Sequence, residues 1–518
     1  MGNWTQQFEL IMPEVLLLVG GLALLLIGAV TRGRRAPKWI AAFAGLVLLA
    51  ALMAVVRLYG ELPQGVSFSR ILPRAGDTVQ TAFMGNIVVD GLALIFKVIA
   101  LVGAAIVVLM ATRYAERFRN GPEFYALVIF ATLAATLLCS AADLVLIYLS
   151  FEFLSITSYV LVCYLKFQPR STEAAIKYLL YGAIAAAVML YGLSLLYGAA
   201  GTTALYGAPG FDKLQLGTRN ALLEVIPAIA RDPSGGPLLI VATLFILVGL
   251  GFKTGAAPFH QWVPDVYDGS PLPVMAWLTV TSSAAGFAAF IRVFVGLIPP
   301  QYWLIAVLLI SALTMTLGNF IALSQTNIKR MMAYSSIAHG GYTLMGLAAL
   351  GAAVQSGVDL GENVYVAYAV PIYMATYVFM NLGALSVITA VYQKIRSHRI
   401  DDYRGLSESA PGLAYAMMFF LLSLAGLPPT AGFFGKFFLF SAAVNTDLMW
   451  LAILAFLNSV VSVGYYWYVV RVMFLRPTDD LAPIRPGFGL RAAVGVSAVM
   501  TLALLVYAAQ FLRLLSNY

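Results

Sequence analysis

The sequence predicts an all-α membrane protein of about fourteen transmembrane helices, and three observations support this class. The chain is 61% hydrophobic and only 10% charged, whereas soluble domains carry about 25% charged residues. Mostly apolar stretches of roughly 20 residues, long enough to cross a hydrocarbon core of about 30 Å, recur along its 518 residues. That core contains no water, so backbone polar groups must pair within each stretch, which favours helices.

The predicted spans follow one another from the N-terminus to the C-terminus. The first lacks a small-residue cleavage site before its basic flank, so it is expected to be a transmembrane helix and not a signal peptide. The fourteen predicted spans are 10–30, 38–58, 87–111, 123–140, 143–165, 173–199, 237–267, 271–297, 302–323, 330–350, 363–394, 410–443, 447–474 and 489–516.

Two longer connections, 59–86 and 200–236, contain Gly and Pro and are only moderately polar. We expect a hairpin or a short helix in these connections, at the outer face of the membrane. Neither offers a soluble domain large enough to bind a nucleotide. The phosphate-binding pattern GxxxxGK[ST] does not occur in the chain.

The basic residues indicate the orientation of the chain. Nineteen of the 31 Lys and Arg residues fall in one set of alternate connections and seven in the other. By the positive-inside rule the first set is cytoplasmic, and an even number of spans then places both termini outside. The net charge of +8 therefore reflects topology and not a nucleic-acid surface. The basic residues within the spans are Lys97, Lys177, Lys253, Arg292 and Lys436.

Two spans are interrupted in a similar way. The seventh contains GLGFKTGAAPFHQW (249–262) and the twelfth AGLPPTAGFFGKFFLF (425–440), and each has Gly, Pro and one lysine. Pro258 and the pair Pro428–Pro429 are expected to break these helices, and the freed backbone groups can hold water and charge. The segments lie five spans apart, so the units that contain them would have opposite orientation, as in the inverted repeats of transporters.

Charged residues inside apolar spans are costly and are functional candidates by default. Glu152 lies about nine residues into its span, roughly 13 Å deep at 1.5 Å per residue. It is a candidate proton carrier, and a structural ion pair between helices is the alternative. Lys253 lies beside the first predicted break, where a desolvated amine could gain and lose a proton. Lys436 follows the second break and has no obvious partner in sequence.

Three further candidates have simpler explanations as well. Lys177 is only about four residues inside its span, so it could extend to the interface or pair with Glu173, one turn earlier. His260 lies two turns beyond Lys253 and titrates easily, but a structural role is the alternative. His339, within AYSSIAHGGY, is equally open to either interpretation.

The remaining acidic and basic positions are expected to be peripheral. Asp90, at the beginning of the third span, is expected at the interface, and Lys97 and Arg292 are expected to extend toward it. Asp265 and Asp268, in HQWVPDVYDGSP, are expected on the cytoplasmic side, as capping residues or partner contacts.

The chain shows no pattern for a redox centre. Its two cysteines, Cys139 and Cys163, are too few for an iron–sulfur cluster, which usually needs four thiolates. The three histidines include no pair within one segment that would ligate a haem. We therefore expect no cofactor and no metal ion in this chain.

Seven longer motifs are spread over most of the chain. They are EFYALVIF (123–130), STEAAIKYLLYGA (171–183), LYGLSLLYG (190–198), PFHQWVPDVYDGSPLPV (258–274), GNFIALSQTNIKRMMAYSSIAHGGY (318–342), SLAGLPPTAGFFGKF (423–437) and NSVVSVGYYWYVVRVM (458–473). In content and order they resemble the antiporter-like membrane subunits of respiratory complex I, and most closely the bacterial subunit N type, the counterpart of mitochondrial subunit 2 and the cyanobacterial B subunit. A lysine at 436 argues against the M type, and the lack of a long C-terminal amphipathic extension argues against the L type.

The resemblance implies a subunit in which two inverted five-helix units span the fourth to eighth and the ninth to thirteenth helices. The corresponding segments are an N-terminal region (1–122), a first repeat (123–299), a second repeat (300–475) and a final helix (476–518). It also implies proton translocation driven by partner subunits that hold NADH, FMN, iron–sulfur clusters and quinone. The expected partners are other membrane subunits of complex I, including further antiporter-like subunits, and lipid, in a bacterial plasma membrane.

The resemblance also implies roles for single residues. Glu152 matches the carboxylate that pairs with a lysine, Lys253 the lysine of the broken helix, and Lys436 the lysine on the exit side. Lys177 matches the lysine of an EAAxKY string. The implied relay runs in this order toward the outer side: Lys177, Glu152, Lys253, His260, His339 and Lys436, with water between them.

One position departs from the family pattern. The family usually has a further lysine in the eighth helix, where this chain has Ser283 in TVTSSAAGF. Ser283 carries no charge, but with Ser282 and Thr281 it could hold a water molecule. Either water bridges the relay there, or this channel couples differently. A sodium/proton antiporter subunit of a multi-subunit transporter and a non-conducting scaffold subunit are the alternatives to a complex I subunit.

Overall fold

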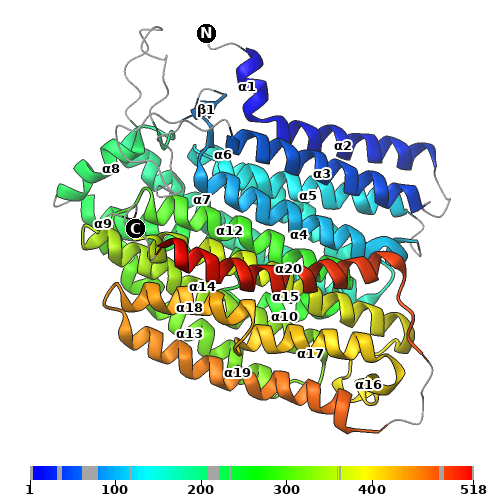
Figure 1. Ribbon diagram of the computed structural model, residues 1–518. Helices are drawn as coiled ribbons and strands as arrows, with labels where there is room; N and C mark the ends of the chain where they lie inside the picture. Colours follow the sequence, from blue (N-terminus) through cyan, green and yellow to red (C-terminus); the bar gives the residue numbers. More distant parts are fainter. Residues whose placement is uncertain are drawn as a thin grey trace.

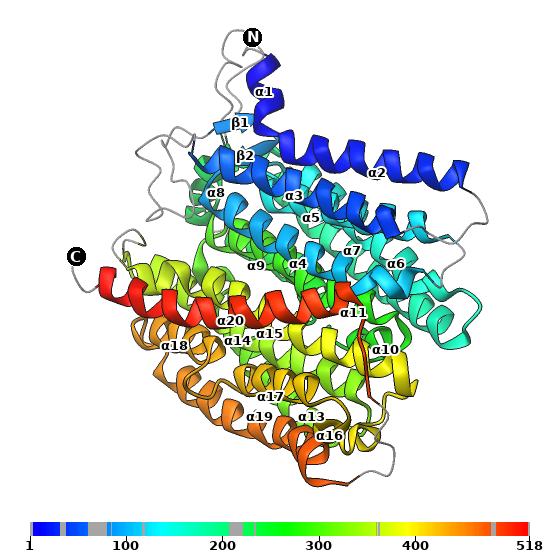
Figure 2. The same ribbon diagram turned by 45° about the vertical axis from the view of Figure 1, so that its right-hand side comes forward.

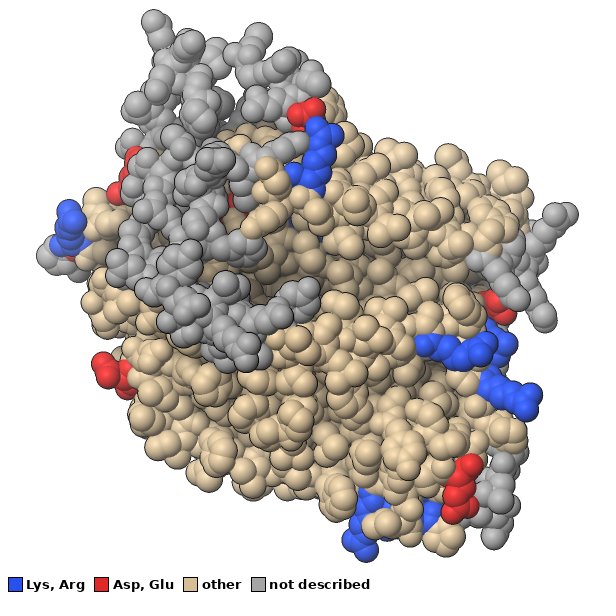
Figure 3. Space-filling model, in the orientation of Figure 1, with Lys and Arg blue, Asp and Glu red and all other residues tan. Residues whose placement is uncertain are grey.

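Long helices that run side by side dominate the structure. The computed structural model describes residues 4–31, 38–60, 80–83, 85–116, 120–206, 221–232, 235–358, 360, 363–477 and 483–515. The helices share one direction, with α2 (Met12–Val30) at one edge of the molecule and α19 (Met449–Leu475) at the opposite edge (Figures 1 and 2). On the face seen in Figure 3, the charged side chains lie near the ends of the helices and the middle is uncharged. This is the charge distribution of a bundle that crosses a membrane.

The number and order of the predicted spans are confirmed. Thirteen described helices are long and apolar enough to cross a membrane, and the shorter pair α17–α18 supplies the remaining span. In order, the spanning helices are α2, α3 (Lys38–Gly60), α4 (Gly91–Ala115), α5 (Gly121–Ser140), α6 (Leu144–Val162), α7 (Pro169–Ala200), α9 (Gly235–Thr254), the composite span 272–295, α13 (Leu304–Leu323), α14 (Ile328–Gln355), α15 (Val364–Ile395), α17 with α18, α19 and α20 (Phe488–Leu515).

The sequence determines locally where several helices begin and end. Asp90 caps α4, because its carboxylate accepts a hydrogen bond from the backbone N–H of Ala93 at 2.8 Å. Asp143 caps α6 in the same way. Gly201 ends α7 with φ 68°, a left-handed conformation that glycine adopts without steric cost.

The seventh and twelfth spans are each broken in two, as the sequence predicts. The halves are α9 and α10 (Trp262–Gly269), and α17 (Pro411–Ala425) and α18 (Ala431–Val444). Gly255 (φ 69°) and Gly426 (φ 83°) directly follow the first halves in the left-handed conformation. Pro258 and the pair Pro428–Pro429 lie in the linking segments, where they interrupt no helical hydrogen bonds.

The eighth span has an irregularity that the sequence does not predict. It consists of α11 (Leu272–Trp277), η3 (Leu278–Ser282), α12 (Ser283–Phe290) and η4 (Ile291–Val295). Both η3 and η4 are π-helical turns. Such turns occur frequently at functional sites, and here one of them immediately precedes Ser283.

Short elements occupy the connections. The strands β1 (Gln80–Ala82) and β2 (Ile87–Val89) form an antiparallel hairpin, and α8 (Leu222–Arg231) is a short helix, so the expected hairpin and short helix are both present. Residues 61–79 and 207–220 of the same connections lie outside the described residues. The other short elements are α1 (Trp4–Leu10), η1 (Cys163–Leu165), η5 (Pro300–Tyr302), η6 (Ile400–Tyr403) and α16 (Leu406–Ser409).

The final helix joins the two parts of the bundle. α20 packs against α4 and α15, and Figure 1 shows it running between the N-terminal helices and the later ones. The beginning of α2 and the end of α20 lie at the same end of the bundle (Figure 1), as an even number of spans requires. The division into two five-helix repeats stays a prediction.

Candidate functional site

Lys253 lies at the break of the seventh span and is held by the neighbouring α6. It is the second-last residue of α9 and only 2% exposed. Its ammonium donates a hydrogen bond to Ser155 Oγ at 3.1 Å and lies 5.4 Å from the ring centroid of Phe151. A cation is thus held inside the bundle by a hydroxyl and an aromatic face.

Glu152 follows Phe151 on α6 and is half-buried. Its Oε1 is buried and has no hydrogen-bond partner within the described part of the chain. The carboxylate and Lys253 interact electrostatically, but the described residues include no ion pair between them at 4.0 Å or less. Glu152 can therefore act on Lys253 through space while it stays available to another partner.

Lys177 lies at one end of the bundle in a charged cluster. It is 40% exposed and forms ion pairs with Glu173 at 2.8 Å and with Asp265 at 2.9 Å, so the local pair with Glu173 is present. Arg330 of α14 pairs with Asp265 from the other side at 2.9 Å. Lys177 and Arg330 thus hold the Asp265 carboxylate from two sides.

The charged cluster surrounds an open cavity of about 310 Å³, which Arg170, Asp268 and Asn327 also line. Asn327 donates a hydrogen bond to Asp268 at 2.8 Å, and Lys329 binds the Asp268 carbonyl oxygen at 2.6 Å. Asp265 and Asp268 thus have partners within the chain, and the cavity is a polar mouth at this end of the bundle.

Aromatic side chains connect this mouth to the surroundings of Lys253. Tyr178, the residue after Lys177, stacks on Trp262 with ring centroids 4.4 Å apart. Trp262 in turn contacts Phe252, the residue before Lys253, at 5.1 Å. Tyr159 of α6 packs edge-on against Tyr178 at 4.8 Å. These aromatic rings are in contact with one another between the cavity and the surroundings of Lys253, and Lys253 itself stays buried.

His260 lies in the link between α9 and α10. It is half-buried, and its Nδ1 is buried without a hydrogen-bond partner in the described part of the chain. The same link is attached to α13, because the backbone N–H of Ala257 donates to Thr314 Oγ1 at 2.9 Å. The free Nδ1 leaves His260 able to bind a water molecule or a proton.

His339 lies near the middle of α14 and is 2% exposed. Its Nδ1 is hydrogen-bonded to the Tyr373 hydroxyl and its Nε2 to the Tyr466 hydroxyl, the latter at 3.2 Å. The next residue, Gly340, approaches the break of α9 so closely that a Cβ there would lie 3.3 Å from the Thr254 carbonyl oxygen. α14 thus brings His339 close to the helix end that contains Lys253.

Lys436 lies on α18 just beyond the second break and is 2% exposed. Its ammonium donates to the Ala425 carbonyl oxygen at 2.9 Å and to Ser459 Oγ at 2.8 Å, and it lies 4.9 Å from the ring centroid of Tyr342. Ala425 is the last residue of α17, so the lysine occupies the negative end of a helix dipole. The break therefore creates the binding site of the lysine.

The described residues contain no group of three or more His, Cys, Asp or Glu side chains that could hold a metal ion. Both cysteines are free thiols.

Comparisons with known proteins identify the family of the chain. Residues 141–462 match the sequence profile of the family described as "NADH:quinone oxidoreductase/Mrp antiporter, TM". The chain is 37% identical to NADH-quinone oxidoreductase subunit N 2 of Symbiobacterium thermophilum, over 99% of this chain and 97% of that protein. It is 41% identical to subunit N of Moorella thermoacetica, over 82% of this chain and 84% of the relative. The chain belongs to the subunit N branch of this family.

Solved structures show the same fold. A chain of respiratory complex I from Thermus thermophilus, solved with bound aureothin, superposes with a TM-score of 0.71 and is 33% identical, covering 95% of this chain and 97% of its own. A chain of the Mrp complex from Dietzia sp. superposes with a TM-score of 0.79 at 19% identity, covering 99% and 96%. The second likeness concerns the fold alone.

In this subunit N family member, Ser283 takes the place of the lysine that the resemblance implies, and its surroundings are now defined. Its hydroxyl donates to the carbonyl oxygen of Leu278, five residues earlier, at 3.2 Å. The Thr281 hydroxyl donates to the Ala100 carbonyl oxygen on α4 at 3.3 Å. Both hydroxyls thus have backbone acceptors, and the π-turn η3 supplies the acceptor for Ser283.

Sequence reasoning missed the polar groups between His339 and Lys436. Asn319 of α13 donates to the Tyr342 hydroxyl at 2.9 Å and accepts from Tyr465 at 3.0 Å. Tyr342 lies beneath the Lys436 ammonium, so this network reaches the second lysine. A partial signal was present, because Ser335, His339 and Tyr342 recur at helical spacing inside the tenth span.

The interpretation of Lys97 and Arg292 as side chains that extend to the interface was wrong. Lys97 is completely buried and pairs with Glu14 at 2.9 Å. Arg292 is 1% exposed and forms two hydrogen bonds with Asp90, at 2.8 and 3.0 Å. Asp90 does begin α4 but is only 4% exposed. These partners are distant in sequence, so only the packed bundle shows them.

Proposed function

We propose that this chain is a proton-translocating membrane subunit of a complex-I-type NADH:quinone oxidoreductase. The observation that carries the proposal is the set of buried titratable side chains Lys253, His339 and Lys436, each hydrogen-bonded to hydroxyl groups inside the spans. Ionisable side chains at such depth mark ion and proton pathways. The subunit N relatives and the complex I chain of similar fold support the assignment to this complex.

Both lysines have partners suited to proton exchange. The Ser155 and Ser459 hydroxyls accept hydrogen bonds from the two ammonium groups and donate their own protons to the carbonyl oxygens of Phe151 and Ala425. A hydroxyl can rotate to donate to a neutral amine instead, so each serine can partner its lysine in either protonation state. Lysine, unlike arginine, can lose its proton when buried. Each lysine can therefore take up a proton from one side and release it to the other without losing its hydrogen-bond partner.

Glu152 is suited to control Lys253. Its carboxylate attracts the ammonium through space but is not in contact with it. When Glu152 takes up a proton or turns to another partner, this attraction ends and the proton of Lys253 can move on toward His339. We expect a change in a neighbouring subunit to drive this step.

We propose that protons enter from the cytoplasmic side through the cavity at Lys177 and Asp265, and that both termini lie outside. The path would continue by Lys253, His260 and His339 to Lys436. Moving one charge against 100 mV of membrane potential costs about 2.3 kcal/mol. We expect this work to come from other subunits, which would hold NADH, FMN, the iron–sulfur clusters and the quinone. Further antiporter-like subunits and lipid would surround the chain.

The test is the Lys253→Met variant in the assembled complex, reconstituted in proteoliposomes. We expect normal assembly and a loss of NADH-driven proton uptake, because a positioned acid–base group contributes about 10²–10⁴-fold to proton transfer. Lys436→Met, with intact assembly, should show the same loss and would argue against a scaffold role. Full pumping by both variants would contradict the proposal, and sodium-dependent transport would favour an antiporter subunit.

A further inference from the structure

A second pair of buried titratable side chains lies outside the proposed relay, among the N-terminal helices. Glu14 is in the first turn of α2, and Lys97 is in the second turn of α4. Their side chains are 5% and 0% exposed, and Lys97 Nζ lies 2.9 Å from Glu14 Oε1. Neither side chain makes a hydrogen bond with any other described group.

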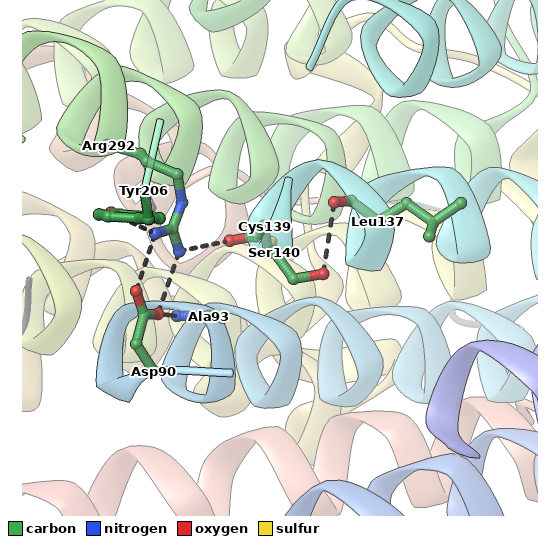
Figure 4. Close-up of polar contacts among 7 residues, drawn as sticks. All are labelled: Asp90, Ala93, Leu137, Cys139, Ser140, Tyr206 and Arg292. Carbon is green, nitrogen blue, oxygen red and sulfur yellow. Dashed lines mark hydrogen bonds and ion pairs between the residues drawn. The ribbon is translucent and has the colours of Figure 1, made fainter. Parts of the chain in front are cut away.

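The neighbouring Asp90–Arg292 pair shows what a structural pair looks like in this bundle. Arg292 donates twice to Asp90, once to the Tyr206 hydroxyl at 3.1 Å and once to the Cys139 carbonyl oxygen at 3.0 Å (Figure 4). Asp90 also caps α4. An arginine does not lose its proton in proteins, so this pair is a permanent clamp between α4, α5 and η4.

The Glu14–Lys97 pair lacks both the additional hydrogen bonds and the permanently charged arginine of the Asp90–Arg292 pair. A buried ion pair offsets its desolvation cost only with good geometry and further hydrogen bonds, and the described residues supply no further hydrogen bond to either side chain. Stability therefore does not explain the pair. Both members can change protonation state, since a proton can pass from the ammonium to the carboxylate and leave an uncharged amine and an uncharged acid.

The surroundings of the pair shield both side chains from solvent. Cys139 of α5 interacts electrostatically with both members of the pair and with Arg292, and the Asp90 carboxylate balances the charge of Arg292. A small apolar cluster lies over the beginning of α2, where Ile11 packs with Ala82 and Ile87 of the hairpin. The pair is thus close to the end of the bundle where α2 begins, but it is covered.

We propose that Glu14 and Lys97 form a second proton-exchange site of this subunit, near the membrane face at which α2 begins. The resting pair is an ammonium and a carboxylate, with no net charge. Release of the Lys97 proton toward the aqueous phase gives an uncharged amine and a carboxylate with one net negative charge, and uptake of a new proton by the amine restores the pair. This inference rests on the proposed function, because the proton must be delivered by a translocating subunit.

The deciding variant is Lys97→Arg in the assembled complex. Arginine keeps the positive charge and the ion pair with Glu14 but cannot give up a proton, so a purely structural role would be preserved. We expect normal assembly and normal NADH oxidation by an uncoupled complex. We also expect proton uptake into proteoliposomes per NADH oxidised to fall, because the removed exchange group is worth about 10²–10⁴-fold in proton-transfer rate.

Two companion variants keep the test decisive if Lys97→Arg does not assemble. The exchanged pair Glu14→Lys with Lys97→Glu retains an ion pair that can exchange a proton and should pump. The neutral pair Glu14→Gln with Lys97→Met leaves no unpaired charge and should assemble but lose coupling. An unchanged ratio of protons to NADH in Lys97→Arg or in the neutral pair overturns the inference. If Lys253→Met and Lys436→Met both pump fully in the same preparation, the proposed function itself fails.

Discussion

At the scale of single residues, the two central lysines share one arrangement that only the folded chain shows. Lys253 donates to Ser155, 98 residues away, and Lys436 donates to Ser459, 23 residues away. The depth of both lysines was predictable from the apolar stretches around them. Their serine partners were not, because a serine in a span usually binds its own helix backbone and nothing local distinguishes these two.

For Ser283, sequence and structure together predict how far proton pumping depends on its hydroxyl. Its hydroxyl is engaged by the Leu278 carbonyl oxygen in the π-turn, so it is not needed to hold a relay water. We expect Ser283→Ala to assemble and to pump within about twofold of wild type, since a neutral hydrogen bond is worth only about 1 kcal/mol. The measurement is NADH-driven proton uptake in proteoliposomes. A loss as large as that of Lys253→Met would show that the proton crosses at Ser283.

At the scale of elements, the broken helices were predictable because their cause is local. Proline removes a backbone donor, and glycine adopts left-handed φ values. The proline in PFHQW and the glycine and prolines in GLPP therefore interrupt their helices in any context. The π-turns η3 and η4 have no such signature in TVTSSAAGF or IRVFV. They form where the eighth span is packed almost completely by other helices, and packing is a property of the whole bundle.

The second break gives a prediction about the positioning of Lys436. Gly426 has φ 83°, and a Cβ there would lie 2.8 Å from Lys436 Cδ. Gly426→Ala should therefore displace the lysine from Ala425 and Ser459, in addition to a conformational cost of about 1–2 kcal/mol. We expect weakened proton pumping at near-normal assembly. The control is Gly412→Ala at the beginning of α17, where a Cβ meets no atom within 4 Å. Equal pumping by both variants would contradict this role of Gly426.

At the scale of the whole molecule, hydropathy predicted the spans. The sequence did not predict which distant side chains pair with one another. The fourteen spans follow from apolar length alone, as does their order. The buried pairs Glu14–Lys97 and Asp90–Arg292 were missed because each charge lies near a span end, where extension to the interface is the simpler interpretation. Their partners come from α2 and η4, and the adjacency of those elements to α4 is fixed by tertiary packing.

Orientation in the membrane is the remaining property of the whole molecule, and it follows from the distribution of charge. Lys166 and Arg170 flank the exposed Gln168 between α6 and α7, on the side that the positive-inside rule assigns to the cytoplasm. The exposed Asn445, after α18, lies an odd number of spans away and therefore on the outer side. In a Cys163→Ser background, a membrane-impermeant maleimide should label Asn445→Cys from outside intact cells. It should label Gln168→Cys only after permeabilisation, and the reverse pattern would invert the proposed direction of proton transport.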